Sequence, residues 1–215
     1  MKNQWSDKKA AAAVRSVRRA GVPKPLADCI YASRLLGADR KLVLHGGGNT
    51  SVKADVFDLS GMSVEGLHVK ASGHDLADIE AKGFTTLDLA QLRRLEALNA
   101  LSDIDMLAAL TRAKLRPSEA APSVETLLHA FLPAPYIFHS HANAALALTN
   151  QPNGRSIVEK IFGDEVIVLP YAMSGFALAS GIALYQLRND VRESHTLLAE
   201  QVCADFRSIR PFRNA

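Results

Sequence analysis

The hydrophobic positions of the chain recur at helical spacing in some segments and at strand spacing in others. Apolar residues line one side of residues 6–19 and 25–36, and a polar cap or a terminating glycine marks the ends of these segments. The same criteria predict helices at residues 88–100, 102–115, 123–133 and 142–148, and a mostly helical segment after residue 177.

Short runs of β-branched, aromatic and other apolar residues between these helices predict strands. They lie at residues 42–44, 51–54, 67–70, 135–141 and 166–169. A polar segment at residues 58–61 predicts a hairpin between the second and third of these strands. Because strands alternate with helices and no internal repeat is visible, the pattern indicates an α/β fold in a single domain over residues 1–215.

The composition agrees with one globular domain. With 215 residues and 48% hydrophobic content, the chain can bury a sizeable core. Cys29 and Cys203 are too few for a disulfide framework and lack metal-site spacing, which fits a reducing cytoplasm. The first residues lead into a charged segment, so we expect no secretory signal. The longest uncharged stretch, residues 166–187, contains Pro170 and two glycines, which argues against a membrane span.

The net charge of +3 comes partly from basic residues near the two ends of the chain. No aromatic residues alternate with them and no nucleic-acid-binding motif is visible, so we interpret them as solvated helix faces and expect no nucleic-acid partner. The residues are Lys8, Lys9, Arg15, Arg18, Arg19, Arg207, Arg210 and Arg213.

Two histidines at alternate positions are the first candidates for chemistry. In an extended strand, His139 and His141 project to the same face, with Cβ atoms roughly 6–7 Å apart. They stand where a strand runs out into a helix, which is where α/β proteins place their sites. The two imidazoles can share one metal ion, or each can be held by hydrogen bonds to the backbone.

A glycine-rich turn at residues 46–48 is the second candidate. Successive glycines permit positive φ angles and leave backbone N–H groups unshielded, and Asn49 follows with a short polar side chain. Residues 72–73 form a similar corner. These turns can bind an anion with the help of Lys53 and Lys70, or they can be plain tight turns beside surface lysines. The turn is neither a Walker loop nor a dinucleotide fingerprint, because the required lysine and helix start are missing.

Glu125 is the third candidate, in the first turn of a predicted helix capped by Ser123. A carboxylate there interacts well with the helix dipole, and it can also act as a general base or as a metal ligand. His129 lies four residues later on the same helix face, and we interpret it as a structural partner. Tyr171 and Tyr185 carry phenols that can donate a proton, although we expect both to serve packing.

Four motifs occur in an order that resembles a known family. They are Leu44-His45-Gly46-Gly47-Gly48-Asn49-Thr50-Ser51, Ala71-Ser72-Gly73, Ser123-Val124-Glu125 and His139-Ser140-His141-Ala142. Together they resemble class II aldolase/adducin domains, over about residues 25–178. Residues 123–131 and 148–152 are especially similar to the aldolase half of bifunctional rhamnulose-1-phosphate aldolase/short-chain dehydrogenase proteins.

The resemblance implies a fold and a reaction. The fold would have three layers, with a central, mainly antiparallel sheet flanked by helices. The reaction would be the reversible cleavage of a ketose 1-phosphate of the rhamnulose or fuculose type to dihydroxyacetone phosphate and an aldehyde. Zn²⁺ or another divalent metal would stabilise the charge that develops, without a lysine Schiff base. Family members form tetramers with sites at their interfaces, so we expect a homo-oligomer.

The resemblance also implies roles for individual residues. Glu125 matches the catalytic acid/base that removes or returns the proton at the carbon next to the ketone. His139 and His141 match two of three zinc ligands. The residues that match the family's phosphate site are Gly48, Asn49, Thr50, Ser72, Gly73 and Ser123.

One departure from the family pattern concerns the third zinc ligand. The family has a His-Gly pair on a late strand, and this chain has none there. His195 is either a substitute ligand or a surface residue of a charged helix, and the likeness fades from about residue 178, as in a diverged or shortened copy. A non-catalytic, adducin-like module for self-association or partner binding is therefore a rival hypothesis. A metal hydrolase is a third, which the anion-binding turns fit less well.

Overall fold

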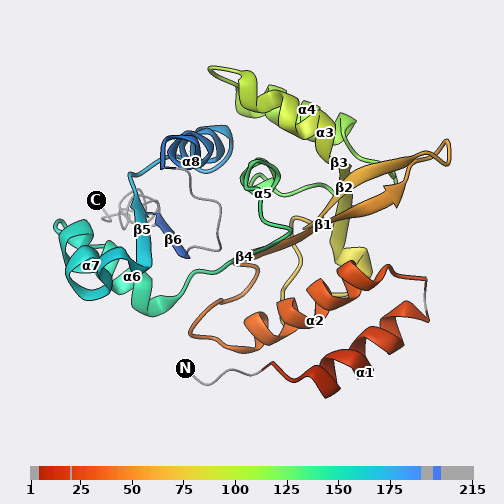
Figure 1. Ribbon diagram of the computed structural model, residues 1–215, viewed down its shortest axis with the longest axis horizontal. Coiled ribbons are helices and arrows are strands. Elements are labelled where there is room, and N and C mark those ends of the chain that lie inside the picture. The colour runs from red at the N-terminus through yellow and green to blue at the C-terminus, as the bar shows by residue number, and fades with distance from the viewer. Residues whose placement is uncertain (1–4, 20, 190–195, 200–215) are drawn as a thin grey trace, which may run out of the picture.

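The computed structural model describes residues 5–19, 21–189 and 196–199 (Figure 1). Its central element is a four-stranded sheet with the order β3-β2-β1-β4, in which every neighbouring pair is antiparallel. The strands are β1 (Asn49–Phe57), β2 (Ser63–Lys70), β3 (Phe84–Asp88) and β4 (Tyr136–His139). The late strand β4 thus pairs with the beginning of β1.

β1 and β2 form the predicted hairpin. The carboxylate of Asp58 closes the turn, because it accepts hydrogen bonds from the backbone N–H groups of Ser60 and Met62 at 2.8 and 2.9 Å. Gly61 supplies the positive φ angle, +83°, that the turn requires. The end of the hairpin projects beyond the helices in Figure 1.

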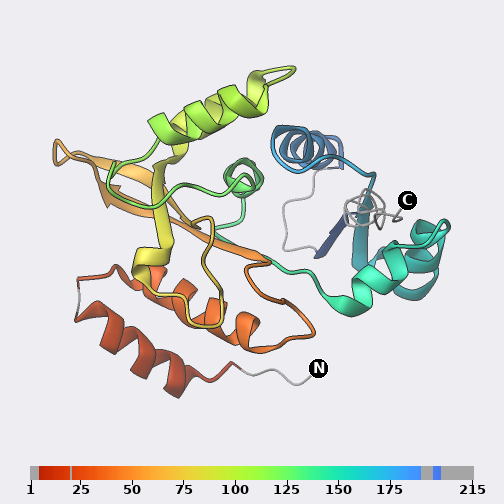
Figure 2. The same cartoon turned by 180° about the vertical axis from the view of Figure 1, so that it is seen from behind.

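One face of the sheet is covered by the second of two N-terminal helices, and the first helix packs on the outer side of the second (Figures 1 and 2). They are α1 (Asp7–Arg18) and α2 (Lys24–Ala38), close to the predicted bounds. Ser6 caps α1 as expected, since its hydroxyl accepts a hydrogen bond from the backbone N–H of Lys9. A buried apolar cluster joins α2 to the sheet and to the loop after β2. Its members are Leu26, Cys29, Ile30, Val43, Val52, Leu76, Ile79 and Phe84.

The other face of the sheet is covered by α3 (Leu89–Arg93), α4 (Asp103–Arg112) and α5 (Thr126–Phe131). Short 3-10 helices, η1 (Ala81–Gly83) and η2 (Arg94–Ala97), precede β3 and follow α3. Asp88 and Ser102 cap α3 and α4 through their side chains. The larger apolar cluster lies on this side. It includes Leu67, Val69, Leu87, Leu89, Leu92, Met106, Leu110, Leu127, Ala130 and Phe131.

The C-terminal part continues beyond β4. It comprises α6 (Asn143–Thr149), α7 (Gly154–Phe162), η3 (Gly163–Glu165), β5 (Val166–Leu169), α8 (Phe176–Asn189) and β6 (Thr196–Ala199). β5 and β6 form a two-stranded parallel sheet with α8 as the connection. α8 packs on α5, where Leu178 and Ile182 join the larger cluster. The predicted α/β class is confirmed, with a mainly antiparallel central sheet between helical layers.

Some local predictions were wrong. Residues 42–44 lie in a loop rather than a strand and join neither edge of the sheet. Val43 is buried in this loop, whereas Leu44 is 41% exposed. The helix predicted at residues 88–100 ends early, in η2.

The end of the described chain also differs from expectation. Thr196 and Leu197, interpreted as part of a charged helix, lie in β6. His195, Cys203 and the three C-terminal arginines fall outside the described residues. Within the parts of the chain that the structure describes, no helix combines the length and the apolar character needed to cross a bilayer.

Candidate active site

The two candidate metal-binding histidines lie at the end of β4. His139 is the last residue of the strand and pairs with Asn49, the first residue of β1. His141 lies beyond the strand, in the loop that precedes α6. The two rings nevertheless stand side by side, with centroids 4.9 Å apart and planes inclined by 58°. The predicted proximity is therefore present, although the strand ends before the second histidine.

Glu125 approaches this pair from the N-terminal end of α5. It is the N-cap residue of the helix rather than part of its first turn. Its Oε2 atom lies 3.4 Å from Nδ1 of His139 and accepts a hydrogen bond of 3.3 Å from Nδ2 of Asn49. One ligand atom each from Glu125, His139 and His141 can be chosen so that all three lie within 4.8 Å of one another. Asn49 and Glu125, which are 76 positions apart in the chain, thus lie in direct contact.

This donor set fits a divalent metal. Two imidazoles and one carboxylate form a common ligand set of catalytic zinc sites, which keep a fourth position open. Nδ1 of His139 is buried and faces Oε2 of Glu125 at 3.4 Å, a contact too poorly formed to count as a hydrogen bond, so this nitrogen is available to a metal ion. The contacts of Glu125 keep it charged: burial raises its pKa, but His139, His129 and Asn49 together lower it to about 2.

The glycine turn lies directly beside His141. A Cβ atom on Gly47 would sit 3.4 Å from Nδ1 of His141. Gly48 has a φ angle of +71°, and a Cβ there would overlap Val43 and the carbonyl oxygen of His139. Only glycine allows the backbone to pass this close to the metal-binding candidates.

Lys70 connects the glycine turn to the second predicted corner. Its side chain is 4% exposed, and its Nζ donates a hydrogen bond of 3.1 Å to the carbonyl oxygen of Gly46. Burial lowers its pKa, whereas the carboxylates of Glu125 and Asp75 oppose this shift. Ser72 and Gly73 follow after the buried Ala71 and are exposed. A buried lysine therefore lies against the glycine turn and interacts electrostatically with Glu125.

Ser123 belongs to the same region. Ala71 forms a β-bridge with Pro122, and the N–H of Ser72 donates to the carbonyl oxygen of Ala121 at 3.1 Å. These contacts place the corner at residues 72–73 against the segment that leads into Glu125. The hydroxyl of Ser123 accepts a hydrogen bond of 3.2 Å from the N–H of Glu125, as a helix-start residue does.

Two of the six residues matched to a phosphate site face elsewhere in the structure. Thr50 is fully buried, and its hydroxyl shares a hydrogen bond of 2.8 Å with Ser33 of α2, on the far side of the sheet. Asn49 is 1% exposed and uses its amide on Glu125. Of the other four, Gly48 is buried in the glycine turn, whereas Ser72 and Gly73 are exposed and Ser123 is half-buried at the second corner.

Other residues considered from the sequence lie away from this corner. Lys53 donates hydrogen bonds to the carbonyl oxygens of Leu132 and Ala134, beyond the C-terminal end of α5. His129 is fully buried and shares a hydrogen bond of 2.8 Å with Ser51, as the structural interpretation expected. The Tyr171 hydroxyl contacts Met173, and Tyr185 packs on the larger cluster.

The direct contacts of Asn49 with Glu125 and of Ser51 with His129 were not predicted from the sequence. One signal was available: residues 49, 51 and 53 are polar at alternate positions, so they share one face of β1. Polar side chains on the buried face of a strand need hydrogen-bond partners. The helix that packs on that face, here α5, is where such partners are expected.

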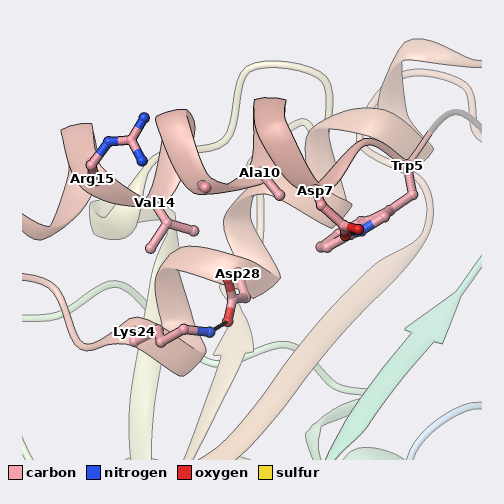
Figure 3. Close-up of a pocket in the computed structure, with 8 residues that line it drawn as sticks. Trp5, Asp7, Ala10, Val14, Arg15, Lys24 and Asp28 are labelled. Carbon is pink, nitrogen blue, oxygen red and sulfur yellow. Dashed lines mark hydrogen bonds and ion pairs between the residues drawn. The ribbon is translucent and has the colours of Figure 1, made fainter.

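A separate hollow lies between α1 and α2 (Figure 3). It has a volume of about 330 Å³, with Trp5, Ala10 and Val14 among its lining residues, and the ion pair between Lys24 and Asp28 borders it. The hollow is on the α2 side of the sheet, whereas the candidate metal group is on the α5 side. It therefore takes no part in the candidate site.

Comparisons with known proteins point to one family. Residues 27–200 match the family model described as "Class II Aldolase and Adducin N-terminal domain". A relative from Bacillus subtilis, described as "Uncharacterized oxidoreductase YuxG", is 38% identical over 168 residues, which are 78% of this chain and 24% of the relative. The chain thus spans about a quarter of the length of this curated relative.

Two solved structures extend the comparison. An N-terminal class II aldolase domain of a conserved protein from Thermoplasma acidophilum is 35% identical, with a TM-score of 0.78, and the match covers 94% of this chain and 86% of that one. An aldolase II superfamily protein from Pseudomonas syringae matches with 13% identity and a TM-score of 0.51, over 92% of this chain and 65% of that one. The second likeness concerns the fold alone.

Proposed function

Because the chain belongs to the class II aldolase and adducin family, we propose that it is a metal-dependent carbon–carbon lyase acting on a phosphorylated ketose. The proposed reaction is the reversible cleavage of a ketose 1-phosphate of the rhamnulose or fuculose type to dihydroxyacetone phosphate and an aldehyde. The observation that carries the proposal is the meeting of Glu125, His139 and His141 within 4.8 Å, beside a turn built for close backbone approach. The proposed location is the cytoplasm.

His139 and His141 would hold the metal, with Glu125 as the third protein donor in the absence of substrate. The proposed metal is Zn²⁺, because two nitrogen ligands and one oxygen ligand are typical of its catalytic sites. When bound, the metal supplies Lewis-acid polarisation of the hydroxy-ketone oxygens. Glu125 takes the place that the family's His-Gly histidine leaves open in the described part of the chain.

Glu125 is the proposed acid/base. In the cleavage direction, the hydroxyl group next to the broken bond gives its proton to the Glu125 carboxylate and becomes the aldehyde oxygen, the electron pair of the bond passes to the carbon next to the ketone, and Glu125 returns the proton to that carbon. In the synthetic direction its carboxylate removes the same proton. The low pKa of Glu125 ensures that the carboxylate starts synthesis in its ionised form, and Asn49 holds the orientation of Oε2.

The phosphate would bind at the corner formed by Gly48, Ser72, Gly73 and Ser123. Gly73 is exposed and has a φ angle of +79°, so its backbone N–H would face the anion, and the side-chain hydroxyl of the exposed Ser72 would add a donor because its N–H is already bonded to the carbonyl oxygen of Ala121. Lys70 would add a positive charge from the buried side. This combination favours a phosphorylated substrate over the substrates of a metal hydrolase.

The rival function is a non-catalytic module for self-association. It is favoured by the missing His-Gly pair and by three large apolar residues at the tip of the β1–β2 hairpin. Phe57, Leu59 and Met62 are 66%, 75% and 65% exposed. Such a patch is typical of a surface that contacts another protein. The family resemblance implies a homo-oligomer, which we propose to be a tetramer. Both the lyase and the module for self-association are compatible with it.

The deciding experiment measures metal and product together. Purified protein is analysed for bound metal, and the metal-loaded protein is then assayed for dihydroxyacetone phosphate released from rhamnulose 1-phosphate and fuculose 1-phosphate. We expect about one zinc per chain and release of product that stops after chelation and returns with Zn²⁺. Protein that retains no divalent metal and releases no product from either substrate would favour the module for self-association.

A further inference from the structure

Three successive inward-facing residues of β1 are joined to α5 or to the chain just after it. Asn49 donates to Glu125 at the beginning of the helix. Ser51 shares a hydrogen bond of 2.8 Å with His129, one turn later. Lys53 donates to carbonyl oxygens beyond the end of the helix. We name these three contacts the β1–α5 ladder.

The middle contact, between Ser51 and His129, is the most deeply buried of the three. Ser51 and His129 are both 0% exposed, and the neighbouring residues Leu67, Val69 and Leu127 belong to the larger apolar cluster. A buried polar pair adds little net stability compared with apolar residues of the same size, but its hydrogen bond is directional. It therefore fixes the rotation and the axial position of α5 on the sheet, which apolar contacts alone define less sharply.

His129 is linked to Glu125 through the backbone as well. Its N–H donates to the carbonyl oxygen of Glu125 at 3.4 Å, so the two residues bracket one turn. A short helix of six residues has few hydrogen bonds of its own to resist a shift. A displacement of His129 would therefore move the N-cap residue, and with it the carboxylate beside His139.

On the basis of the function proposed above, we propose that Ser51 and His129 are positioning residues for Glu125. The Ser51–His129 contact holds α5 in the position that places the carboxylate next to the metal-binding histidines. Neither residue touches the substrate. The contact acts through one helical turn.

The test compares two serine-to-alanine variants. Ser51→Ala removes the contact to His129. Ser33→Ala is the matched control, since Ser33 is also 0% exposed and its hydroxyl bonds Thr50 on the opposite face of the sheet. The readouts are the affinity of metal-free protein for Co²⁺, followed by absorbance, and the kcat and KM for release of dihydroxyacetone phosphate.

We expect Ser51→Ala to lower kcat about tenfold and to weaken Co²⁺ binding several-fold, with KM within about twofold of the wild type. Ser33→Ala should change all three values by less than about twofold, although both variants lose thermal stability. Rescue provides a second readout: His129→Asn keeps a polar group near the Nδ1 position and should retain more activity and Co²⁺ affinity than His129→Leu.

The two proposals fail in different ways. If Ser51→Ala and Ser33→Ala lower kcat and Co²⁺ affinity equally, or if Asn and Leu at position 129 behave alike, the positioning role is overturned while the enzyme remains. If the wild-type protein neither binds Co²⁺ nor releases product, the proposed function is overturned and the positioning role with it.

Discussion

The two faces of the central sheet differ in how their buried polar groups are hydrogen-bonded. On the α2 face, Thr50 bonds Ser33, and the Thr86 hydroxyl donates to Glu119 and contacts the His68 ring at 3.0 Å. These groups form contacts among themselves, with Nε2 of His68 as an exception.

On the α5 face, several buried polar atoms have no hydrogen-bond partner within the described residues. Oδ1 of Asn49, Nε2 of His129 and Nδ1 of His139 are all of this kind, and their residues surround Glu125. Buried polar atoms without partners cost stability, so their concentration at one place indicates a site that a ligand completes. The α2 face pairs most of these polar groups, whereas the α5 face leaves three buried polar atoms without hydrogen bonds around Glu125, as the proposed metal site would require.

Removing the charge of Glu125 is the most direct test of the proposal that the α5 face, and not the α2 face, carries the activity. We expect Glu125→Gln to lower kcat by about 100-fold to 10,000-fold, the range for loss of a general acid/base. The amide is nearly the same size, so the fold should be kept, although the melting temperature should fall because the contacts that lower the pKa of Glu125 stabilise its charged form. The measurement is steady-state release of dihydroxyacetone phosphate, with circular dichroism as the check on folding. Unchanged turnover would remove Glu125 from the mechanism.

The close packing of the glycine turn gives the next largest effect. Gly48→Ala should lower the free energy of unfolding by about 3–4 kcal/mol, because it adds a strained φ angle and overlaps with two neighbours. The Cβ would lie 2.5 Å from Val43 Cγ1 and 2.9 Å from the carbonyl oxygen of His139. Denaturant unfolding measures the loss.

Gly61→Ala is the matched control for this variant. Gly61 has a similar φ angle, +83°, but no atom lies within 4 Å of its added Cβ. Its cost should therefore be the backbone strain alone, about 1–2 kcal/mol. Equal losses for the two variants would contradict the close approach of the turn to β4.

Much of this arrangement was accessible from the sequence, and the reasons for the exceptions are physical. Alternation and a polar turn predicted the β1–β2 hairpin, and four ordered motifs brought Glu125 together with His139 and His141. β3 was not predicted, because four of its five residues are buried and no alternation is visible. The contacts of Asn49 and Lys53 with the region of α5 were also not predicted, since partners about 80 residues away depend on the tertiary fold.

His68 allows the α2 face to be tested by pH. Burial lowers its pKa from 6.5 to about 4, so the ring is neutral in the folded protein at pH values where the unfolded chain already binds a proton. The stability contributed by the neutral ring is complete above pH 6.5 and is lost as the pH falls toward 4. The expected loss is about 3 kcal/mol at about 1.4 kcal/mol per pKa unit.

The measurement is the free energy of unfolding of wild type and His68→Asn between pH 7 and pH 4. Asparagine keeps a polar group near Thr86 but does not titrate, so the wild type should lose about 3 kcal/mol more than the variant over this range. Parallel curves for the two proteins would show that His68 does not cause the pH dependence.

The smallest expected effect concerns the contact between Ser33 and Thr50. Ser33→Ala leaves the Thr50 hydroxyl, buried on the α2 face, without this partner, which should cost about 1 kcal/mol. In Ser33→Ala/Thr50→Val both hydroxyls are absent, and the double variant should be no less stable than the single one, since no unpaired hydroxyl remains. Chemical unfolding of the two single variants and the double variant gives the coupling energy. The Ser33 hydroxyl also donates to the carbonyl oxygen of Cys29 at 2.6 Å, so additive losses would mean that this contact, rather than the one with Thr50, accounts for the stability that Ser33 contributes.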